Sequence, residues 1–153
     1  MLRTGFVYGL FDVDGDDVLY VGSTWVMRKR ISSHKRWCYK ENDDRHYNLF
    51  VYQHIRENGG FEKFEFRLLE EVEVEDNLNA RNKIEQEYID HYGIENLLNE
   101  RPAYITEEQR VAREKKRDKE RYQIRKHDPK VKEQQKLSSR RYQERQKEKN
   151  NMS

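Results

Sequence analysis

Four features of the sequence combine residue types and spacings that can perform acid–base or phosphate chemistry. Tyr8 and Tyr20 lie on two predicted strands, where tyrosine is also simply a good strand former. Arg30 and His34 are four residues apart and share one helix face, although such a pair alone is most often an exposed polar face. His46 precedes a predicted helix and is equally well explained as a loop histidine.

The fourth feature is a pair of glutamates on one predicted helix. At about 100° per residue, Glu85 falls on the apolar side of this helix and Glu87 lies about 160° away from it. Glu85 is therefore expected to point into the packed side of the domain and Glu87 into solvent. A buried carboxylate needs a compensating partner, and a metal ion is one candidate.

The elements that must position these residues begin with a β-hairpin. Residues 6–11 and 18–22 are apolar runs rich in strand formers, and the Asp-rich segment 12–17 between them is typical of a turn. The segment does not fit a calcium loop, because Gly15 stands fourth rather than sixth and Ser23 stands where a glutamate is needed. Alternation of apolar and charged residues predicts a third strand over about 64–74.

Three helices are predicted around these strands. The first is capped by Ser23 or Thr24 and runs to about Tyr39, and a polar loop follows over 41–45. The order β-β-α-α-β-α predicts an α/β fold, with a small three-stranded antiparallel sheet flanked by helices and a charged helical C-terminal extension. The other two helices are predicted from about Leu49 to the pair Gly59-Gly60, and from Asp76 or Asn77 to Tyr92.

Composition divides the chain of 153 residues near residue 100. Residues 1–100 hold 13 Lys and Arg against 20 Asp and Glu, a net charge of −7, and 41 hydrophobic residues. Residues 101–153 carry a net charge of +9 and only 11 hydrophobic residues. The first part can therefore bury a core, whereas the second is expected to be a basic, highly charged helical or partly disordered tail.

Several classes of protein do not fit this sequence. No apolar run approaches the roughly 18–20 residues of a membrane span, and no secretory leader opens the chain. We therefore expect an intracellular protein of the cytoplasm or nucleus, not a secreted or membrane protein. The single cysteine, Cys38, excludes a disulfide framework and a zinc ribbon within the chain.

The tail carries helix signals and a weak repeat. Thr106 and Gln109 form a capping-box pattern before a charged helix to about Lys126, and Asp128-Pro129 begins another helix. The tail is either a DNA-contacting element, with tyrosines that can stack on bases, or simply a solvated charged helix. The candidate contacts fall in two similar segments twenty residues apart and are Arg121, Tyr122, Arg125, Arg141, Tyr142 and Arg145.

Taken in order, these positions resemble the GIY-YIG nuclease family, which is named for two tripeptides on its first hairpin. Here the tripeptides read Phe6-Val7-Tyr8 and Tyr20-Val21-Gly22, so the first keeps only its tyrosine. The family's helix arginine and histidine fall eight and twelve residues after the glycine, where Arg30 and His34 stand. The family's metal-binding glutamate and closing asparagine are matched by Glu85, four residues before an isoleucine, and by Asn99.

The resemblance implies a DNA endonuclease that uses one divalent ion, Mg²⁺ or Mn²⁺, held mainly by Glu85. Arg30 would contact the scissile phosphate, Tyr8 would be the general base or orient the attacking water, and His34 would accept or relay the proton. Tyr20 would position water or phosphate. Gly22 would allow close backbone approach, and Asn99 and His46 would support the site. The stretches 58–60 and 68–71 look like phage homing endonucleases, and the run 98–104 looks like GIY-YIG proteins of large DNA viruses.

Two other functions stay open at this stage. The chain could be a nucleic-acid-binding module that kept the fold without catalysis, but that interpretation expects the loss of Tyr8, Arg30 or Glu85, and all three are present. It could also be an interaction protein whose charged tail binds another protein. The oligomeric state is open, since a monomer with one site must nick twice or dimerise to cut both strands.

Overall fold

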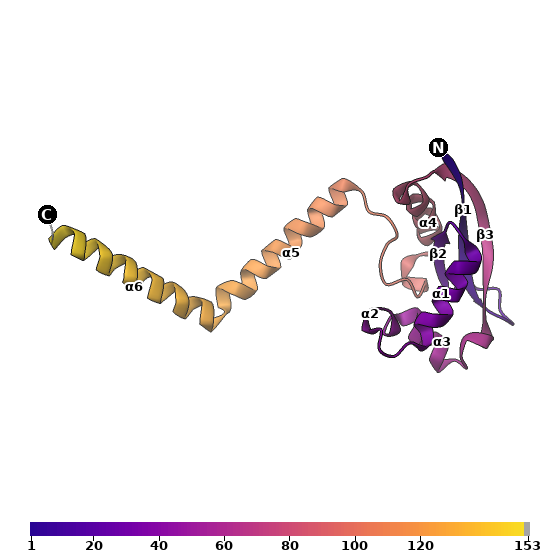
Figure 1. Cartoon of the computed structure of the whole chain (residues 1–153), viewed down its shortest axis with the longest axis horizontal. Coiled ribbons are helices and arrows are strands. Elements are labelled where there is room, and N and C mark those ends of the chain that lie inside the picture. Colours follow the sequence, from indigo (N-terminus) through magenta and orange to yellow (C-terminus); the bar gives the residue numbers. More distant parts are fainter. Residues whose placement is uncertain (152–153) are drawn as a thin grey trace. The chain divides into compact units, whose positions relative to one another are not determined.

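The computed structural model describes residues 1–151 and contains two compact units, the first of which is Met1–Tyr104 and the second of which begins at Ile105. The first unit is built on a three-stranded antiparallel sheet in the order β2-β1-β3 (Figure 1). The strands are β1 (Leu2–Asp12), β2 (Tyr20–Thr24) and β3 (Phe64–Glu75). The predicted fold class is confirmed, and the hairpin of β1 and β2 lies where the two apolar runs indicated.

Strand β1 is longer than its apolar run because it pairs with the long strand β3 from Leu2 to Asp12. The pairing shifts register between Val7 and Tyr8, which leaves Leu69 of β3 without a partner on β1. Such a bulge changes which side of the sheet the following residues face. Leu69 accordingly packs with the residues on one face of the sheet, whereas its neighbour Leu68 is 52% exposed.

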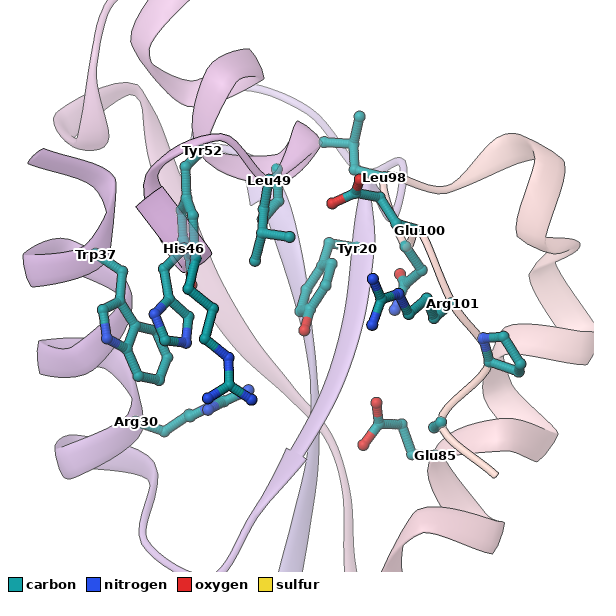
Figure 2. A pocket seen from close by; sticks show the side chains of 15 residues that line it. Tyr20, Arg30, Trp37, His46, Leu49, Tyr52, Glu85, Leu98, Glu100 and Arg101 are labelled. Carbon is teal, nitrogen blue, oxygen red and sulfur yellow. The ribbon is translucent and has the colours of Figure 1, made fainter. Parts of the chain in front are cut away.

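Helices cover both faces of the sheet, and each face has its own apolar cluster. Successive residues of a strand point to opposite faces. On one face, Leu10 packs against the helices α1 (Met27–Tyr39) and α3 (Phe50–Glu57). On the other, Val7 and Val21 pack against Ile89 of helix α4 (Leu78–Tyr92). The edge strand β2 therefore lies between α1 and α4 (Figure 2).

Two local predictions were wrong. Ser23 and Thr24 belong to β2 rather than to a helix cap, and α1 begins only at Met27, with Val26 at its N-cap position. The polar segment 41–45, predicted as a loop, overlaps the start of a short helix, α2 (Asp44–Tyr47). The sequence did not reveal the first difference, because serine is a common helix-capping residue and here its hydroxyl bonds to Glu85 instead. It did not reveal the second, because the single turn of α2 is too short to show a helical spacing of apolar residues. Two 3₁₀ turns complete the unit, η1 (Phe61–Lys63) and η2 (Ile94–Asn96).

The second unit consists of two helices, as the tail's signals predicted. Helix α5 (Glu107–His127) begins with the Thr106 and Gln109 capping box, in which both reciprocal hydrogen bonds are present. Helix α6 (Pro129–Asn151) follows Asp128, whose side chain accepts a hydrogen bond from the backbone N–H of Lys130. Across residues 1–151, none of the helices combines the length and the apolar character that crossing a bilayer requires.

Candidate active site

Tyr8 is the centre of a buried hydrogen-bonded network. Its side chain is fully buried, and its hydroxyl lies 2.8 Å from Nε of Arg30 and 2.8 Å from Nε2 of His34. Because a guanidinium can only donate, the Tyr8 oxygen accepts from Arg30. With a neutral His34 that carries its proton on Nδ1, the Tyr8 hydroxyl donates to Nε2. The structure therefore places the hydroxyl of Tyr8 next to a base and a cation.

His34 is held on its other side by a residue that the sequence did not single out. Its Nδ1 lies 2.8 Å from the hydroxyl of Tyr52 on α3. Tyr52 is spaced like any core residue of its helix, so no sequence signal marked its hydroxyl as a partner. With Tyr52 accepting from Nδ1–H, the ring is fixed with Nε2 free to accept the Tyr8 proton.

Burial keeps both members of this pair neutral. Desolvation raises the pKa of Tyr8 well above its ordinary value, the nearby Tyr20 adds to this, and the positive charge of Arg30 opposes it. Burial, reinforced by the Arg30 charge, lowers the pKa of His34 from 6.5 to about 3. Near neutral pH, Tyr8 is therefore a phenol and His34 an uncharged hydrogen-bond acceptor, and in the free protein the proton of their hydrogen bond stays on Tyr8.

The buried neutral His34 gives a pH-dependent stability. An unfolded chain takes up a proton at this histidine below about pH 6.5, whereas the folded chain does so only near pH 3. The contribution of His34 to the free energy of unfolding is therefore fully present above about pH 6.5. It falls as the pH is lowered, by up to about 1.4 kcal/mol per pH unit. Urea unfolding between pH 7 and 4 should show a steeper loss for the native chain than for His34→Gln. Equal slopes would contradict the assignment.

Gly22 makes room for the Tyr8 hydroxyl. A Cβ atom added at Gly22 would lie 2.4 Å from the Tyr8 hydroxyl oxygen and 2.6 Å from its ring carbon Cζ. Gly22 is opposite Tyr8 in the pairing of β1 and β2, and the tyrosine side chain is fully buried. The glycine is therefore required by close packing rather than by an unusual backbone angle.

Gly22→Ala should displace Tyr8 and break its bonds to Arg30 and His34. We expect a loss of about 1–3 kcal/mol of stability from overpacking. We also expect the nuclease activity that the sequence resemblance implies to fall far more than this loss of stability explains. The control is Gly9→Ala on β1, whose added Cβ would meet the Phe11 and Val18 side chains instead. Thermal unfolding and cleavage rates of both variants test this, and a Gly22→Ala enzyme with normal activity would contradict it.

Glu85 faces the network from α4, on the other side of β2. Its Oε2 accepts a hydrogen bond from the Ser23 hydroxyl at 2.5 Å, and the Ser23 oxygen accepts in turn from Nε of Arg81 at 2.9 Å. Burial raises the pKa of Glu85, while Ser23, Arg30 and Arg81 oppose that rise. Glu87 is exposed, as the helical geometry predicted. Sequence reasoning missed Arg81 and assigned Ser23 to a helix cap.

A cavity of about 480 Å³ opens between α1 and α4 across β2. Figure 2 shows Tyr20 on the strand between Arg30 and Glu85. Burial, with the charge of Glu85, raises the pKa of Tyr20 to about 12. Tyr8 does not line the cavity, since its hydroxyl lies behind Arg30. The cavity thus presents a cation, a phenol and a carboxylate to one space of ligand-binding size.

Asn99 closes the open edge of β2. Its Nδ2 donates to the Val21 carbonyl at 2.8 Å, and its Oδ1 accepts from the Val21 N–H at 2.9 Å. The Leu98 N–H also donates to the Leu19 carbonyl. These hydrogen bonds pair backbone N–H and C=O groups on the open edge of β2 and fix the segment that follows η2 to that edge, beside the cavity.

His46 lies in the opposite wall of the cavity. Its ring stacks on Trp37 at 4.4 Å with an angle of 5°, and its Nδ1 lies 3.0 Å from Asp43. The Arg30 guanidinium lies over the Trp37 ring at 5.2 Å from its centroid. His46 is therefore an ordered part of the wall rather than a free loop residue, and the sequence did not identify Trp37 as its support.

The donor set of this site fits a hard divalent cation bound partly by solvent and substrate. Among residues 1–151, no three His, Cys, Asp or Glu side chains lie close enough together to hold a metal by protein ligands alone. Ser23 bonds to Oε2 of Glu85, and Glu85 lines the cavity. Its other carboxylate oxygen, Oε1, is therefore available to bind a cation. A single carboxylate with water and phosphate oxygens suits Mg²⁺, which keeps several waters in most protein sites.

The candidate residues of the tail lie on the two helices of the second unit. Tyr122 on α5 and Tyr142 on α6 are each 64% exposed. All of the candidates are exposed, and they are Arg121, Tyr122, Arg125, Arg141, Tyr142 and Arg145. Their side chains are thus accessible to a partner.

Comparison with known proteins agrees with the resemblance found in the sequence. No curated protein and no solved structure matches the chain significantly. Residues 4–99 match the GIY-YIG catalytic domain, a match that covers all eight site candidates of the first unit. This domain is a nuclease domain that hydrolyses phosphodiester bonds, and many of its members use a divalent metal. The chain therefore belongs to the GIY-YIG nuclease family.

Proposed function

We propose that this chain is a metal-dependent DNA endonuclease with its active site in the cavity between α1 and α4. The carrying observation is the Tyr8 hydroxyl held between Arg30 and His34, beside a cavity that Glu85 lines from the other side. This arrangement provides a proton acceptor, a phosphate-binding cation and a carboxylate within one site. Hydrolysis of a phosphodiester needs all three functions.

In the proposed mechanism, Arg30 binds the scissile phosphate and stabilises the negative charge that develops on it. A phosphate offers the guanidinium a charged acceptor in place of the Tyr8 phenol, so its binding favours movement of Arg30 away from Tyr8. This movement exposes the hydroxyl to water. Tyr8 then takes the proton of the attacking water as its own proton passes to Nε2 of His34.

The other residues orient the reactants. Tyr20 positions the water or a phosphate oxygen through its hydroxyl, and Gly22 keeps the space that Tyr8 occupies. Asn99 maintains the edge of β2, and His46 acts as an accessory residue of the cavity wall. Glu85 would hold one ion, Mg²⁺ or Mn²⁺, through its cavity-facing oxygen. When bound there, the ion would supply positive charge that stabilises the leaving oxygen.

We propose that the nuclease domain comprises residues 1–100 and that the tail, 101–153, supplies DNA affinity. The net charge of −7 in the first part opposes binding to a polyanion, whereas the +9 of the tail favours it. Arg121, Arg125, Arg141 and Arg145 would contact phosphates, and Tyr122 and Tyr142 would stack on bases or sugars. Such binding is largely independent of sequence and weakens steeply with salt.

The subtype that we favour is the nuclease of phages or large DNA viruses. Support comes from the sequence alone, from residues 58–60, 68–71 and 98–104 together with the charged tail. Within these 153 residues Cys38 is the only cysteine, so they contain no Cys-rich module. A nuclease domain followed by a basic segment is closer to the homing or viral type than to a repair type.

The proposed function is tested with the full-length chain and supercoiled plasmid DNA in Mg²⁺, in Mn²⁺ and in EDTA. We expect nicked or linear product with either ion, none in EDTA, and less product as salt rises. Cleavage that persists in EDTA would contradict the metal requirement. Protein that is folded and shifts DNA without cutting any plasmid would instead indicate a binding module.

A further inference from the structure

Two arginines that the proposed mechanism does not use line the same cavity as Arg30. Arg45 comes from α2, next to His46, and Arg101 follows Asn99 on the opposite wall. Figure 2 shows His46 and Trp37 on one side of the cavity and Arg101 on the other, with Tyr20 between them. The two arginines therefore reach the cavity from opposite walls.

Both guanidinium groups lack partners within the described part of the chain. Among residues 1–151, neither Arg45 nor Arg101 makes a side-chain hydrogen bond or an ion pair with a carboxylate, whereas Arg3 pairs with Asp76 and Arg67 with Glu65. A guanidinium carries five donors. Two such groups at one cavity are free to bind an anion without first breaking a protein contact.

The backbone that carries each arginine is fixed. Arg101 follows Asn99, which is bonded to Val21, and Glu100, whose carboxylate accepts from the Phe50 N–H at the start of α3. Helix α2 is attached to α3, because the Arg56 side chain on α3 donates a hydrogen bond to the Tyr47 carbonyl at the end of α2. The arginines are thus exposed side chains on a fixed backbone, which reduces the entropy lost when they bind.

The charges around the cavity favour an anion there. Only two acidic residues line it, Glu85 and Glu100, and the second is partly compensated at the α3 N-terminus. The far edge of the sheet is strongly acidic, since β3 carries five glutamates. In an acidic domain, three arginines therefore line one cavity at the edge formed by β2.

We propose that Arg45 and Arg101 bind the two phosphates that flank the scissile phosphate, one from each wall of the cavity. This inference rests on the proposed function, in which Arg30 binds the scissile phosphate itself. A bound strand would then cross the edge of β2 from the α2 wall to the 98–103 wall. Three arginines would fix three consecutive phosphates, and this sets the register of the strand without reading its bases.

The test uses DNA duplexes in which a single phosphate near the mapped cleavage position is replaced by an uncharged methylphosphonate. With the native chain, neutralising either flanking phosphate should lower kcat/KM about tenfold. Arg45→Ala and Arg101→Ala should each lower kcat/KM on unmodified DNA by a similar factor. The kcat/KM of each variant should then not fall further when the phosphate that the missing arginine would bind is neutralised. It should still fall about tenfold when the other flanking phosphate is neutralised. Arg28→Ala, which removes an exposed arginine outside the cavity, is the matched control and should behave as the native chain.

Native kcat/KM for both variants on unmodified DNA, or equal losses at every substituted phosphate, would overturn the proposal. A second measurement separates it from the proposed function. Affinity for the same duplex in EDTA is measured against salt, where each cavity variant should reduce the slope of log K against log[salt] by about 0.9 and Arg28→Ala should not. If the native chain cuts no DNA but these slopes differ as expected, the proposed function fails, while phosphate binding by Arg45 and Arg101 is still supported. If the slope of log K against log[salt] is unchanged in Arg45→Ala and Arg101→Ala, the proposal that these arginines bind phosphates is refuted.

Discussion

Tyr8→Phe is expected to lower kcat for DNA cleavage by about 10²–10⁴-fold, the usual contribution of a general base. The change removes only the hydroxyl that lies between Arg30 and His34. No other group within this network can pass a proton to Nε2 of His34 at that position. Substrate binding should change little, because Tyr8 is fully buried and does not line the cavity.

The measurement is single-turnover cleavage with saturating metal, with DNA affinity determined in EDTA. Phenylalanine leaves Arg30 Nε and His34 Nε2 without their common partner, which should cost about 1–3 kcal/mol of stability. Tyr122→Phe on α5 removes an exposed hydroxyl and is the control, with an expected cleavage rate close to native. If Tyr8→Phe cuts DNA within a few-fold of the native rate, Tyr8 is not the general base, and Tyr20 becomes the next candidate for that role.

Arg30→Gln is expected to lower kcat by about 10²–10³-fold, because it removes the charge that stabilises the phosphate in the transition state. It should also change the pH dependence. The Arg30 charge helps to lower the pKa of His34, so its removal raises that pKa and lets the ring take up a proton at a higher pH. Because the mechanism needs a neutral His34, the loss of rate on the acid side should move to higher pH in the variant.

Arg30→Lys distinguishes charge from geometry at this position. Lysine keeps the positive charge but lacks the planar fork of donors through which arginine binds a phosphate. We expect a rate between those of the native and glutamine enzymes, with the native pH profile partly restored. Arg36→Gln on the same helix is the control, since Arg36 is exposed and does not line the cavity. Equal rates for native chain and Arg30→Gln would remove Arg30 from the mechanism.

The sequence predicted the sheet and the longer helices because their signals are local. The alternation over residues 64–74 and the helical spacing that ends at Gly93 each follow from one element. The bulge at Leu69 could not be predicted, because it depends on how β3 pairs with a strand more than fifty residues away. The short helix α2 carries too few residues to show a period.

Spacing within one element carried part of the signal for the site, and other candidates, such as Gly22 and Asn99, came from the family resemblance. Helical geometry separates Glu85 from Glu87, and a four-residue spacing places Arg30 beside His34. Tyr52 and Ser23 could not be assigned, since their hydroxyls reach His34 and Glu85 across different elements. Such contacts appear only when the fold brings helices from both faces to the edge of β2.

The most direct test of the account compares Glu85→Ala with Glu87→Ala in plasmid cleavage with Mg²⁺. The two glutamates lie on the same helix, but only Glu85 lines the cavity and bonds to Ser23. We expect Glu85→Ala to abolish nicking while retaining its fold and its DNA binding in EDTA, and Glu87→Ala to cut at the native rate. Glu85→Ala that cuts DNA at the native rate would contradict the assignment of the active site.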